Sequence, residues 1–244
     1  MFDKARIVLI ETSHPGNIGA AARAMKCMGL TRLYLVSPGR FPCAEATARA
    51  SGADDVLAGA MVRDSLEEAI ADCGLVIGAS ARQRRIPWPL LEPREAAARV
   101  LEAASADTDC ALVFGREHSG LTNEEMELCH FLVTIPTNPG FSSLNLAAAV
   151  QVLCYELRQG AGMAPARAGQ RDARVPAATA EAMERLYEHL QQVMIGTGFL
   201  DPAKPRRLMR RLRRLFNRAG LDSQELQILR GFLAAIEALP GYRK

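Results

Sequence analysis

Short apolar runs rich in β-branched residues alternate with helical stretches over the first 158 residues, and this alternation limits the possible folds most strongly. Five runs have the composition of strands: Arg6 to Glu11, Arg32 to Val36, Leu75 to Ala79, Cys110 to Phe114 and Leu132 to Ile135, with a weaker one around Ala60 to Val62. Strands separated by helices form mostly parallel sheets that helices cover on both faces. The sequence therefore predicts an α/β fold.

The predicted helices lie between these strands and follow ordinary start and stop signals. They span Asn17 to Met28, Ser65 to Asp72, Pro93 to Ala104 and about Ser143 to Arg158. Gly29 suits a left-handed C-terminal cap, and a proline such as Pro93 is tolerated in the first turn of a helix. Residues 1–158 are thus expected to form one domain.

Beyond residue 158 the sequence changes character. Residues 159–176 lack a hydrophobic period and are rich in Gly, Ala and Pro, which predicts a linker. Three helical patterns follow near Thr179 to Met194, Pro205 to Arg218 and Asp222 to Ala238, so residues 177–244 are expected to form a small helical extension. In the middle helix, apolar residues recur at helical spacing and arginines occupy most other positions.

Charge is divided unevenly between these two parts. Residues 1–158 carry 15 Lys and Arg against 19 Asp and Glu, whereas residues 159–244 carry 15 against 8. A basic extension on a mildly acidic domain favours a polyanionic partner. Composition alone leaves open the alternative that the arginine-rich helices are simply solvated.

Composition and spacing exclude several other classes of protein. The longest apolar runs fall far below the roughly 18 residues that span a bilayer, and the N-terminal residues lack the pattern of a secretory signal. We therefore expect a cytoplasmic protein without membrane contact. The six cysteines are isolated, with no Cys-x-x-Cys pair and no histidine at ligand spacing, so they indicate reduced core residues and no metal site.

Three patches of small and polar residues follow predicted strands, where open α/β sheets place their sites. The patches are Ser13 to Ala24, Phe114 to Leu121 and Ile135 to Leu146. The second patch fits neither the G-x-S-x-G nucleophile elbow nor the G-x-G-x-x-G dinucleotide fingerprint, which counts against a hydrolase or a Rossmann dehydrogenase. Taken singly, the first and third patches also suit close helix packing and a well-capped helix.

Together the patches resemble the three ordered motifs of the SpoU branch of the SPOUT methyltransferases. They read Asn17-x-Gly19-x-x-x-Arg23, then Gly115-x-Glu117-x-x-Gly120-Leu121, then Ile135-Pro136 followed by Ser142-Ser143-Leu144-Asn145. The motifs cover residues 5–158. In addition, Ala79-Ser80-Ala81-Arg82-x-Arg84 and the basic helical extension resemble family members that methylate ribose at nucleotide 32 of the tRNA anticodon loop.

This resemblance implies a deep trefoil knot in the C-terminal part of the α/β domain, a two-fold homodimer with its sites at the interface, and S-adenosylmethionine as cofactor. Carried over residue by residue, the cofactor-binding set is Ala79, Ser80, Ala81, Gly115, Arg116, Glu117, Ile135, Ser142, Ser143 and Leu144. Glycine suits this site, because we expect a side chain on Gly115 to obstruct the adenine edge.

The implied reaction is attack of a ribose 2′-oxygen on the methyl group of the cofactor, with Arg23 as the central catalytic residue and Asn17, Ser142 and Asn145 beside it. Guanidinium groups have a reference pKa of about 12.5–13.8 and stay protonated at neutral pH. We therefore interpret Arg23 as a fixed cation that binds a phosphate and favours the 2′-oxyanion, and not as the base. Glu117 is expected to close its motif loop and to counter nearby arginines.

RNA contacts are expected from a second set of residues, since basic groups interleave with the single tryptophan between residues 82 and 89. The full RNA-binding set is Lys26, Arg82, Arg84, Arg85, Trp88, Arg116, Arg207, Arg210, Arg211 and Arg214. A surface loop pinned by a packed tryptophan is the alternative for the first part of this set. The expected partner is tRNA and not DNA.

Two other functions stay open at the level of the sequence. One is a related SpoU methyltransferase that acts on ribosomal RNA or at another tRNA position, which shares the same motifs. The other is an RNA-binding module that keeps the fold and has lost catalysis. Intact Arg23, Asn145 and motif glycines count against the second alternative.

Overall fold

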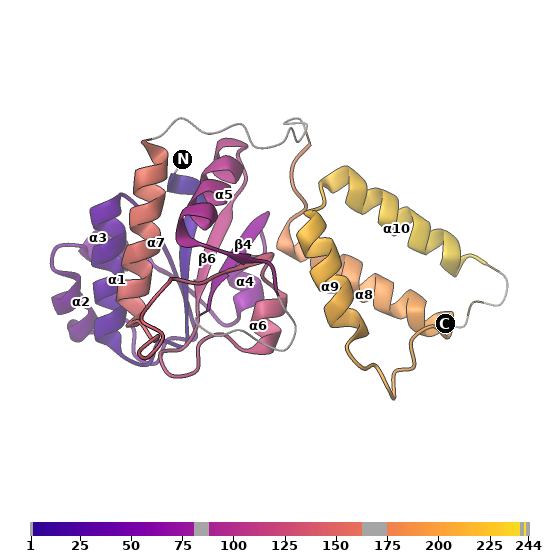
Figure 1. Ribbon diagram of the computed structural model, residues 1–244, viewed down its shortest axis with the longest axis horizontal. Coiled ribbons are helices and arrows are strands. Elements are labelled where there is room, and N and C mark those ends of the chain that lie inside the picture. Colours follow the sequence, from indigo (N-terminus) through magenta and orange to yellow (C-terminus); the bar gives the residue numbers. More distant parts are fainter. Residues whose placement is uncertain (1, 81–87, 163–174, 240–241, 243–244) are drawn as a thin grey trace.

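The computed structural model describes residues 2–80, 88–162, 175–239 and 242, and within these residues seven strands form one sheet (Figure 1). All paired strands run parallel, in the order β3-β2-β1-β6-β4-β7-β5. Their bounds are β1 Ala5–Ile10, β2 Arg32–Val36, β3 Met61–Arg63, β4 Leu75–Ala79, β5 Leu90–Leu91, β6 Cys110–Phe114 and β7 Phe131–Val133. The α/β prediction is confirmed.

The central strands are buried on both faces, as their continuous apolar sequences require. Every residue of β1 and β6 is buried. In the register of the sheet, Ile7 lies opposite Leu33 on one side and Leu112 on the other, and all three side chains contribute to the same core cluster. Because the strands are parallel, their carboxyl ends meet along one edge of the sheet.

Five helices pack on one face of the sheet. They are α1 Pro15–Met28, α2 Ala44–Ala50, α3 Asp54–Ala58, α5 Pro93–Ser105 and α7 Leu146–Ala161. Helices α1 and α2 approach so closely that a Cβ atom on Gly19 would lie 2.0 Å from the backbone oxygen of Ala46. Gly19 therefore serves helix packing, which was one of the two interpretations of the first motif.

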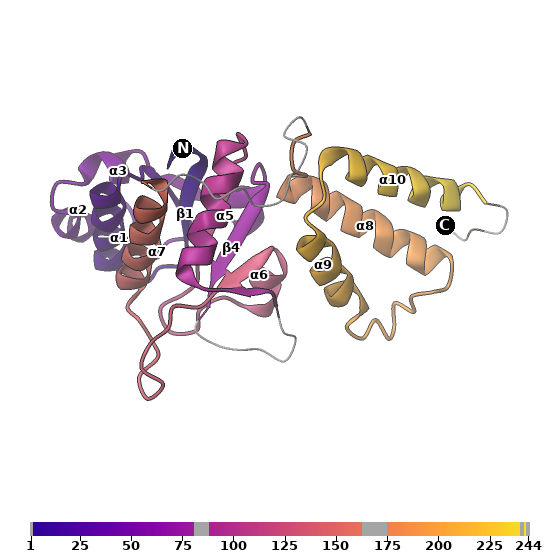
Figure 2. The same cartoon turned by 45° about the horizontal axis from the view of Figure 1, so that its top comes forward.

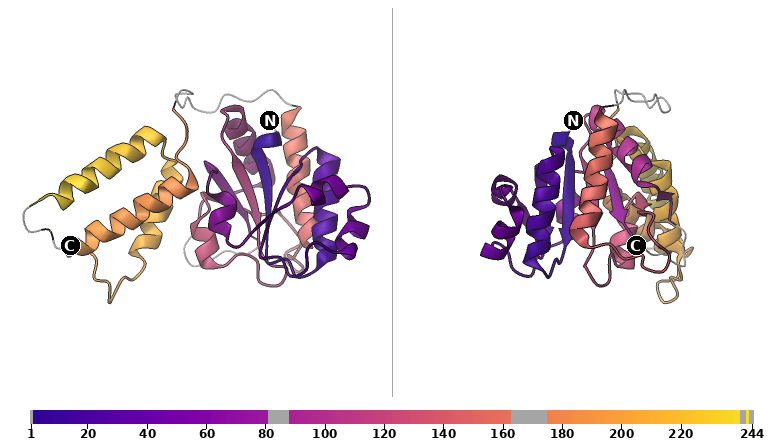
Figure 3. Two further views of the ribbon diagram at one scale, coloured as in Figure 1. Left: turned by 180° about the vertical axis from the view of Figure 1, so that it is seen from behind. Right: turned by 60° about the vertical axis from the view of Figure 1, so that its left-hand side comes forward.

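The opposite face is covered by α4 Leu66–Ile70 and α6 Asn123–Glu127, and the C-terminal unit packs outside these two helices. That unit consists of α8 Ala180–Gly196, α9 Leu208–Ala219 and α10 Ser223–Glu237 around a core of its own. Figure 3 shows from behind that the helical unit lies beside the α/β unit, and Figures 1 and 2 show α9 on the side that faces α6.

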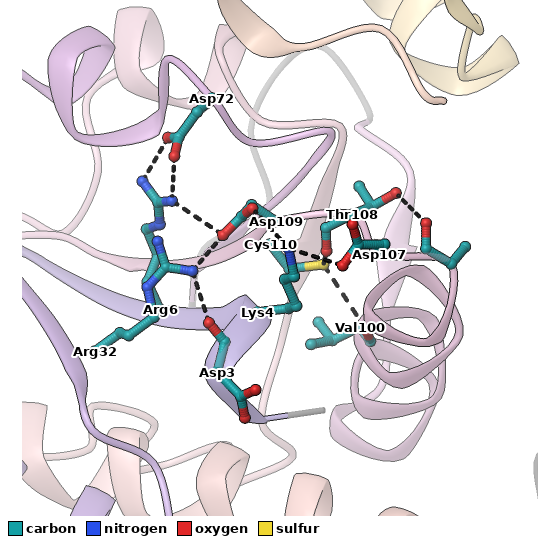
Figure 4. A network of polar contacts seen from close by, with 11 residues as sticks. Asp3, Lys4, Arg6, Arg32, Asp72, Val100, Asp107, Thr108, Asp109 and Cys110 are labelled. Carbon is teal, nitrogen blue, oxygen red and sulfur yellow. Dashed lines mark hydrogen bonds and ion pairs between the residues drawn. The ribbon is translucent and has the colours of Figure 1, made fainter. Parts of the chain in front are cut away.

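A charged network closes the amino-terminal edge of the sheet, opposite the motif loops (Figure 4). The Arg6 side chain is 1% exposed and donates to the two oxygens of Asp72 at 2.6 and 2.7 Å. Asp109 accepts from both Arg6 and Arg32, and the Arg6 guanidinium lies 4.5 Å from the centre of the Tyr34 ring. A buried cation is tolerated here because carboxylates and a ring face surround it.

The boundaries of several elements differ from the prediction. Helix α7 begins three residues later than expected, because Asn145 caps it, and it continues to Ala161 into the expected linker. The prediction missed α2, α3, α6, the two-residue strand β5 and the 3-10 turn Phe2–Lys4. The sequence does contain a start signal for α6, because Thr122 and Glu125 have the spacing of a capping box and form one in the structure.

Candidate functional site

A cavity lies at the carboxyl edge of the sheet, where β4, β6 and β7 end and α7 begins. Its lining combines an apolar floor with a polar rim from the second and third motif patches. The lining residues are Ala79, Ser80, Phe114, Gly115, Arg116, Glu117, His118, Ser119, Gly120, Leu121, Val133, Ile135, Ser142, Ser143, Leu144, Leu146 and Ala149.

Every described member of the expected cofactor set lines this one cavity, and Ala81 lies outside the described residues. The expectation had not included His118, Ser119, Leu146 or Ala149, although they also line it. Leu146 and Ala149 are three residues apart in the first turn of α7, so they lie on one helix face. The i, i+3 spacing of Leu146 and Ala149 is the sequence signal that could have predicted that both face the cavity.

Glu117 ties the loop after β1 to the cavity. Its two carboxylate oxygens accept hydrogen bonds from the backbone N–H and hydroxyl of Ser13, from the backbone N–H of His14 and from Asn17 Nδ2, at 3.1 to 3.2 Å. Partial burial acts to raise the pKa of Glu117, but the hydrogen bonds from Asn17 and from the Ser13 and His14 amides outweigh it and lower the pKa below its ordinary value. Glu117 is therefore a carboxylate that orders a loop.

Among the described residues, the hydrogen-bond partners of Glu117 are amides and a hydroxyl, and the expectation that it also counters nearby arginines stays a prediction. The neighbouring Arg116 is paired instead with Glu11 and Glu125. Both carboxylates raise the pKa of the Arg116 guanidinium, the hydrogen bonds to Glu11 contributing most. The Arg116 side chain thus joins the end of β1 to α6. The sequence predicts that Arg116 contacts RNA, but in this structure it forms ion pairs within the chain.

An amide pair joins the first motif to the third. Asn145 Nδ2 donates to Asn17 Oδ1 at 3.0 Å, while Asn145 Oδ1 accepts from the backbone N–H of Ala147 and Ala148 at 2.9 and 3.3 Å. Asn145 is thus the N-cap of α7 and a tether for α1 at once. With the bond from Asn17 to Glu117, three segments distant in sequence form one connected polar network.

The two serines of the third motif lie at the rim of the cavity. Ser142 and Ser143 are exposed, and Thr137 Oγ1 donates to the backbone oxygen of Ser142 at 3.2 Å across the loop. Figure 2 shows this loop projecting beyond the sheet edge, ahead of α7. The serine hydroxyls are therefore accessible to a polar ligand.

The structure gives a reason for glycine at position 115 that does not depend on a ligand. A Cβ atom on Gly115 would lie 2.2 Å from the carbonyl carbon of Gly120, within the turn that Arg116 and Gly120 close by reciprocal backbone bonds. Gly120 adopts a φ of 69°, which glycine accepts without strain. Glycine here allows the motif turn to fold back on itself, because the backbone of Gly120 leaves no room for a side chain. That a side chain would also obstruct the adenine edge stays a prediction.

Arg23 is exposed on α1 and is not part of the cavity lining. Lys26, one turn further along, donates to Gly52 O at 2.9 Å and forms an ion pair with Asp55 at 2.7 Å. A single copy of the chain therefore brings Asn17, Ser142 and Asn145 to the cavity edge and leaves Arg23 outside it.

The remaining basic residues differ in how they are held. Arg82, Arg84 and Arg85 lie outside the described residues. Trp88 is half-buried against the second core cluster and donates from Nε1 to the Cys129 backbone oxygen at 2.9 Å, which favours the packed-tryptophan alternative. On α9 and its N-cap, Arg207 and Arg211 are exposed, whereas Arg214 is partly buried and Arg210 is paired with Glu127.

No cysteine is among the described residues that line the cavity. All six cysteines are free, and burial raises the pKa of the Cys110 and Cys154 thiols to about 12. Across the described residues, no group of His, Cys, Asp and Glu has a metal-binding arrangement. Within the same residues, no helix is long and apolar enough to cross a membrane.

Two family models match the chain, one for each unit. The SpoU rRNA Methylase family matches residues 4–155, and the tRNA methyltransferase TrmJ, C-terminal domain, matches residues 181–243. The tRNA (cytidine/uridine/adenosine-2′-O-)-methyltransferase TrmJ of Pseudomonas aeruginosa strain UCBPP-PA14 is 54% identical over 240 residues, which cover 96% of this chain and 93% of that protein.

Two further relatives agree with this match. The tRNA (cytidine/uridine-2′-O-)-methyltransferase TrmJ of Escherichia coli strain K12 is 52% identical over 239 residues, covering 97% of this chain and 96% of that protein. The crystal structure of TrmJ from Z. mobilis ZM4 superposes with a TM-score of 0.82 at 35% identity and covers 96% of this chain and 99% of that chain.

Proposed function

The chain belongs to the SpoU rRNA Methylase family, and we propose that it transfers a methyl group from S-adenosylmethionine to the ribose 2′-oxygen at nucleotide 32 of the tRNA anticodon loop. It is an S-adenosylmethionine-dependent tRNA (cytidine/uridine) 2′-O-methyltransferase, the activity for which relatives 54% and 52% identical over nearly its whole length are named. The choice of nucleotide 32 rests on the resemblance of the basic segment and extension. A tRNA substrate also fits the expected cytoplasmic location.

The observation that carries this proposal is the meeting of the second and third motifs in one cavity, with the first motif tied to its rim. The lining fits S-adenosylmethionine chemically. Leu121, Val133, Ile135, Leu146 and Ala149 offer apolar surface for a flat base, and the backbone of the motif turns offers amides and carbonyls for its polar edge. When bound, the cofactor supplies an electrophilic methyl group on a sulfonium.

The side chains of the chain itself would align the ribose and manage charge. Ser142 and Ser143 would hydrogen-bond the ribose or the cofactor from the rim, and Asn17 and Asn145 hold the rim in place. Such alignment contributes as much as about 7–11 kcal/mol in well-oriented reactions. Arg23 would hold a neighbouring phosphate and stabilise the developing 2′-oxyanion as a permanent cation, while phosphate or solvent takes the proton.

A homodimer with two-fold symmetry belongs to the same proposal. Arg23 is exposed and does not line the cavity of its own chain, which supports a site completed by a second copy. The deep trefoil knot is likewise an expectation that family membership carries.

The C-terminal unit would extend the grip on tRNA. Figures 1 and 2 show the segment between α8 and α9 on the same side of the molecule as the loop before α7. Lys204, Arg206, Arg207 and Arg211 lie in or just after that segment and are exposed. Cations on the same side as the cavity favour binding of a polyanion that spans both units. We expect the affinity of the protein for tRNA to fall steeply as the salt concentration rises.

Incubation of the purified protein with methyl-labelled S-adenosylmethionine and unmodified tRNA transcripts tests this function. After alkaline digestion, we expect label in a dinucleotide that resists cleavage, because a methylated 2′-oxygen cannot attack the adjacent phosphate. A resistant dinucleotide containing nucleotide 32 would support the proposed position. Label that is absent, or released in mononucleotides, would overturn the proposal.

A further inference from the structure

Asn217 is a buried polar residue in the last turn of the arginine-rich helix α9. It is 5% exposed and, among the described residues, the one buried member of α9, whose neighbours are mostly arginine and half-exposed leucine. A primary amide in such a position costs free energy unless its hydrogen-bonding groups are satisfied. The partners of Asn217 therefore indicate what its burial achieves.

Those partners come from both units of the protein. Asn217 Oδ1 accepts a hydrogen bond from the Tyr187 hydroxyl on α8 at 2.6 Å. Asn217 Nδ2 donates to the backbone oxygens of Glu127 and Cys129 at 3.3 and 3.2 Å, at the end of α6 and just beyond it. The last carbonyls of a helix have no partner within the helix, so the Asn217 amide caps α6 from outside.

The Cys129 carbonyl is shared with the single tryptophan of the protein. Trp88 Nε1 donates to the same oxygen at 2.9 Å. Trp88 is the first described residue after the basic segment 81–87. One backbone oxygen thus receives a hydrogen bond from the arginine-rich helix and another from the indole next to that segment.

Two ion pairs extend the contact along the same side of α9. Arg210 pairs with Glu127 of α6, and Arg213 pairs with Glu184 of α8 while its guanidinium lies 4.5 Å from the Tyr187 ring centre. Positions 210, 213 and 217 follow the spacing of one helix face. Arg211 lies off this face and is exposed, and Arg207, the N-cap of α9, is exposed as well.

We propose that Asn217 is a positioning residue, which fixes α9 on the α/β unit at the angle that presents Arg207 and Arg211 to tRNA bound at the methyl-transfer site. This proposal rests on the proposed tRNA contacts of the C-terminal unit. A buried amide that is bonded at both its oxygen and its nitrogen, as that of Asn217 is, specifies one orientation, whereas apolar packing alone tolerates several. Asn217 then acts on tRNA affinity through α9, and not on the cofactor or the reacting atoms.

Asn217→Ala is the test, with methyl transfer measured against tRNA concentration at saturating S-adenosylmethionine. We expect KM for tRNA to rise about tenfold, equivalent to about 1.4 kcal/mol, while kcat and the Kd for S-adenosylmethionine stay within about twofold. The emission of Trp88 should also change, because its carbonyl partner loses the neighbouring amide. Asn217→Asp keeps the acceptor for Tyr187 but cannot donate to the carbonyls, so it should not restore KM.

Two further variants keep the test decisive. Tyr187→Phe removes only the hydroxyl that donates to Asn217, and it should raise KM for tRNA in the same direction by a smaller factor. Gln227→Ala removes an exposed amide from α10 in the same unit and should leave KM and Trp88 emission unchanged. Circular dichroism confirms that each variant retains its helices.

A folded Asn217→Ala protein with wild-type KM for tRNA, or one that loses kcat and cofactor affinity instead, would overturn the positioning role. The double variant Arg207→Ala/Arg211→Ala separates this failure from failure of the proposed tRNA contacts. If the double variant raises KM and Asn217→Ala does not, only the positioning role is refuted. If the double variant leaves KM unchanged, the tRNA contacts of α9 are refuted as well.

Discussion

Replacement of Glu117 by glutamine should loosen the polar network that joins the motif loops. The carboxylate accepts hydrogen bonds at one oxygen from Ser13 and at the other from His14 and Asn17. Glutamine turns one of these oxygens into an NH₂ donor, which then faces the backbone N–H of either Ser13 or His14, a group that can only donate. Hydrogen bonds to a charged group contribute about 1.5–3 kcal/mol each, and partial exposure reduces this to about 1 kcal/mol, so Glu117→Gln should lower the free energy of unfolding by about 2 kcal/mol.

The loss should also appear in cofactor binding, because Glu117 itself lines the cavity. We expect the affinity for S-adenosylmethionine to fall about tenfold, which corresponds to about 1.4 kcal/mol. Urea unfolding gives the stability, and calorimetric titration of the cofactor gives the Kd. Glu102→Gln, an exposed substitution on α5, is the matched control and should change neither quantity.

The effect of Glu117→Gln depends on pH in a defined direction. The folded protein lowers the pKa of Glu117, so its ionised form contributes stability above the ordinary glutamate pKa of about 4.3 and loses that contribution as pH falls through the lower folded value. The stability difference between wild type and Glu117→Gln should therefore be full at pH 7 and shrink at acid pH. Equal stability and equal cofactor affinity at pH 7 would refute the role of Glu117 as the loop anchor.

Three other substitutions test separate parts of the account. Arg23→Ala should reduce kcat by about 10²–10³, which is the loss expected when one donor that stabilises the transition state is removed. The affinity for S-adenosylmethionine should stay unchanged. A wild-type rate in single-turnover assays would exclude Arg23 from catalysis. Gly115→Ala should lower the melting temperature and abolish cofactor binding, because the new Cβ would lie 2.2 Å from the carbonyl carbon of Gly120. Retained cofactor binding would contradict this close turn. Asp72→Asn should destabilise the protein by about 1 kcal/mol at pH 7, because it weakens the ion pair with buried Arg6 and solvent already screens the exposed Asp72 carboxylate. Arg6 lowers the pKa of Asp72, so this difference should fade below the ordinary aspartate pKa of about 3.9. Asp107→Asn, at an exposed partner of Lys4, is the control, and an equal loss there would argue against a special role of the Arg6–Asp72 pair.

Local patterns predicted the sheet and the position of the cavity well, for physical reasons. Strands such as Cys110–Phe114 are continuous apolar runs, which a parallel sheet buried on both faces requires. The motif residues follow strand ends, so a parallel sheet gathers them at one edge. The short helices α2 and α3 have seven and five residues and offer too few positions for a helical period to be recognised.

Pairing across the fold could not be predicted from local patterns. The sequence shows arginines at most positions of α9 outside its apolar stripe and does not distinguish them, yet Arg210 and Arg213 are paired with Glu127 and Glu184 of the neighbouring helices. Likewise, the sequence pattern does not distinguish Asn217 from other polar residues, because its carbonyl partners lie on another unit. Partners distant in sequence decide whether a polar side chain is a surface group or a structural one.

Methyl transfer to a tRNA transcript with a single 2′-deoxynucleotide at position 32 tests the central claim most directly. The transcript is made by ligation, and an all-ribose transcript prepared in the same way is the control. The account predicts that methyl-labelled S-adenosylmethionine labels the control and leaves the substituted tRNA unlabelled, because the acceptor oxygen is missing. Equal labelling of both transcripts would contradict it and place the methyl group elsewhere.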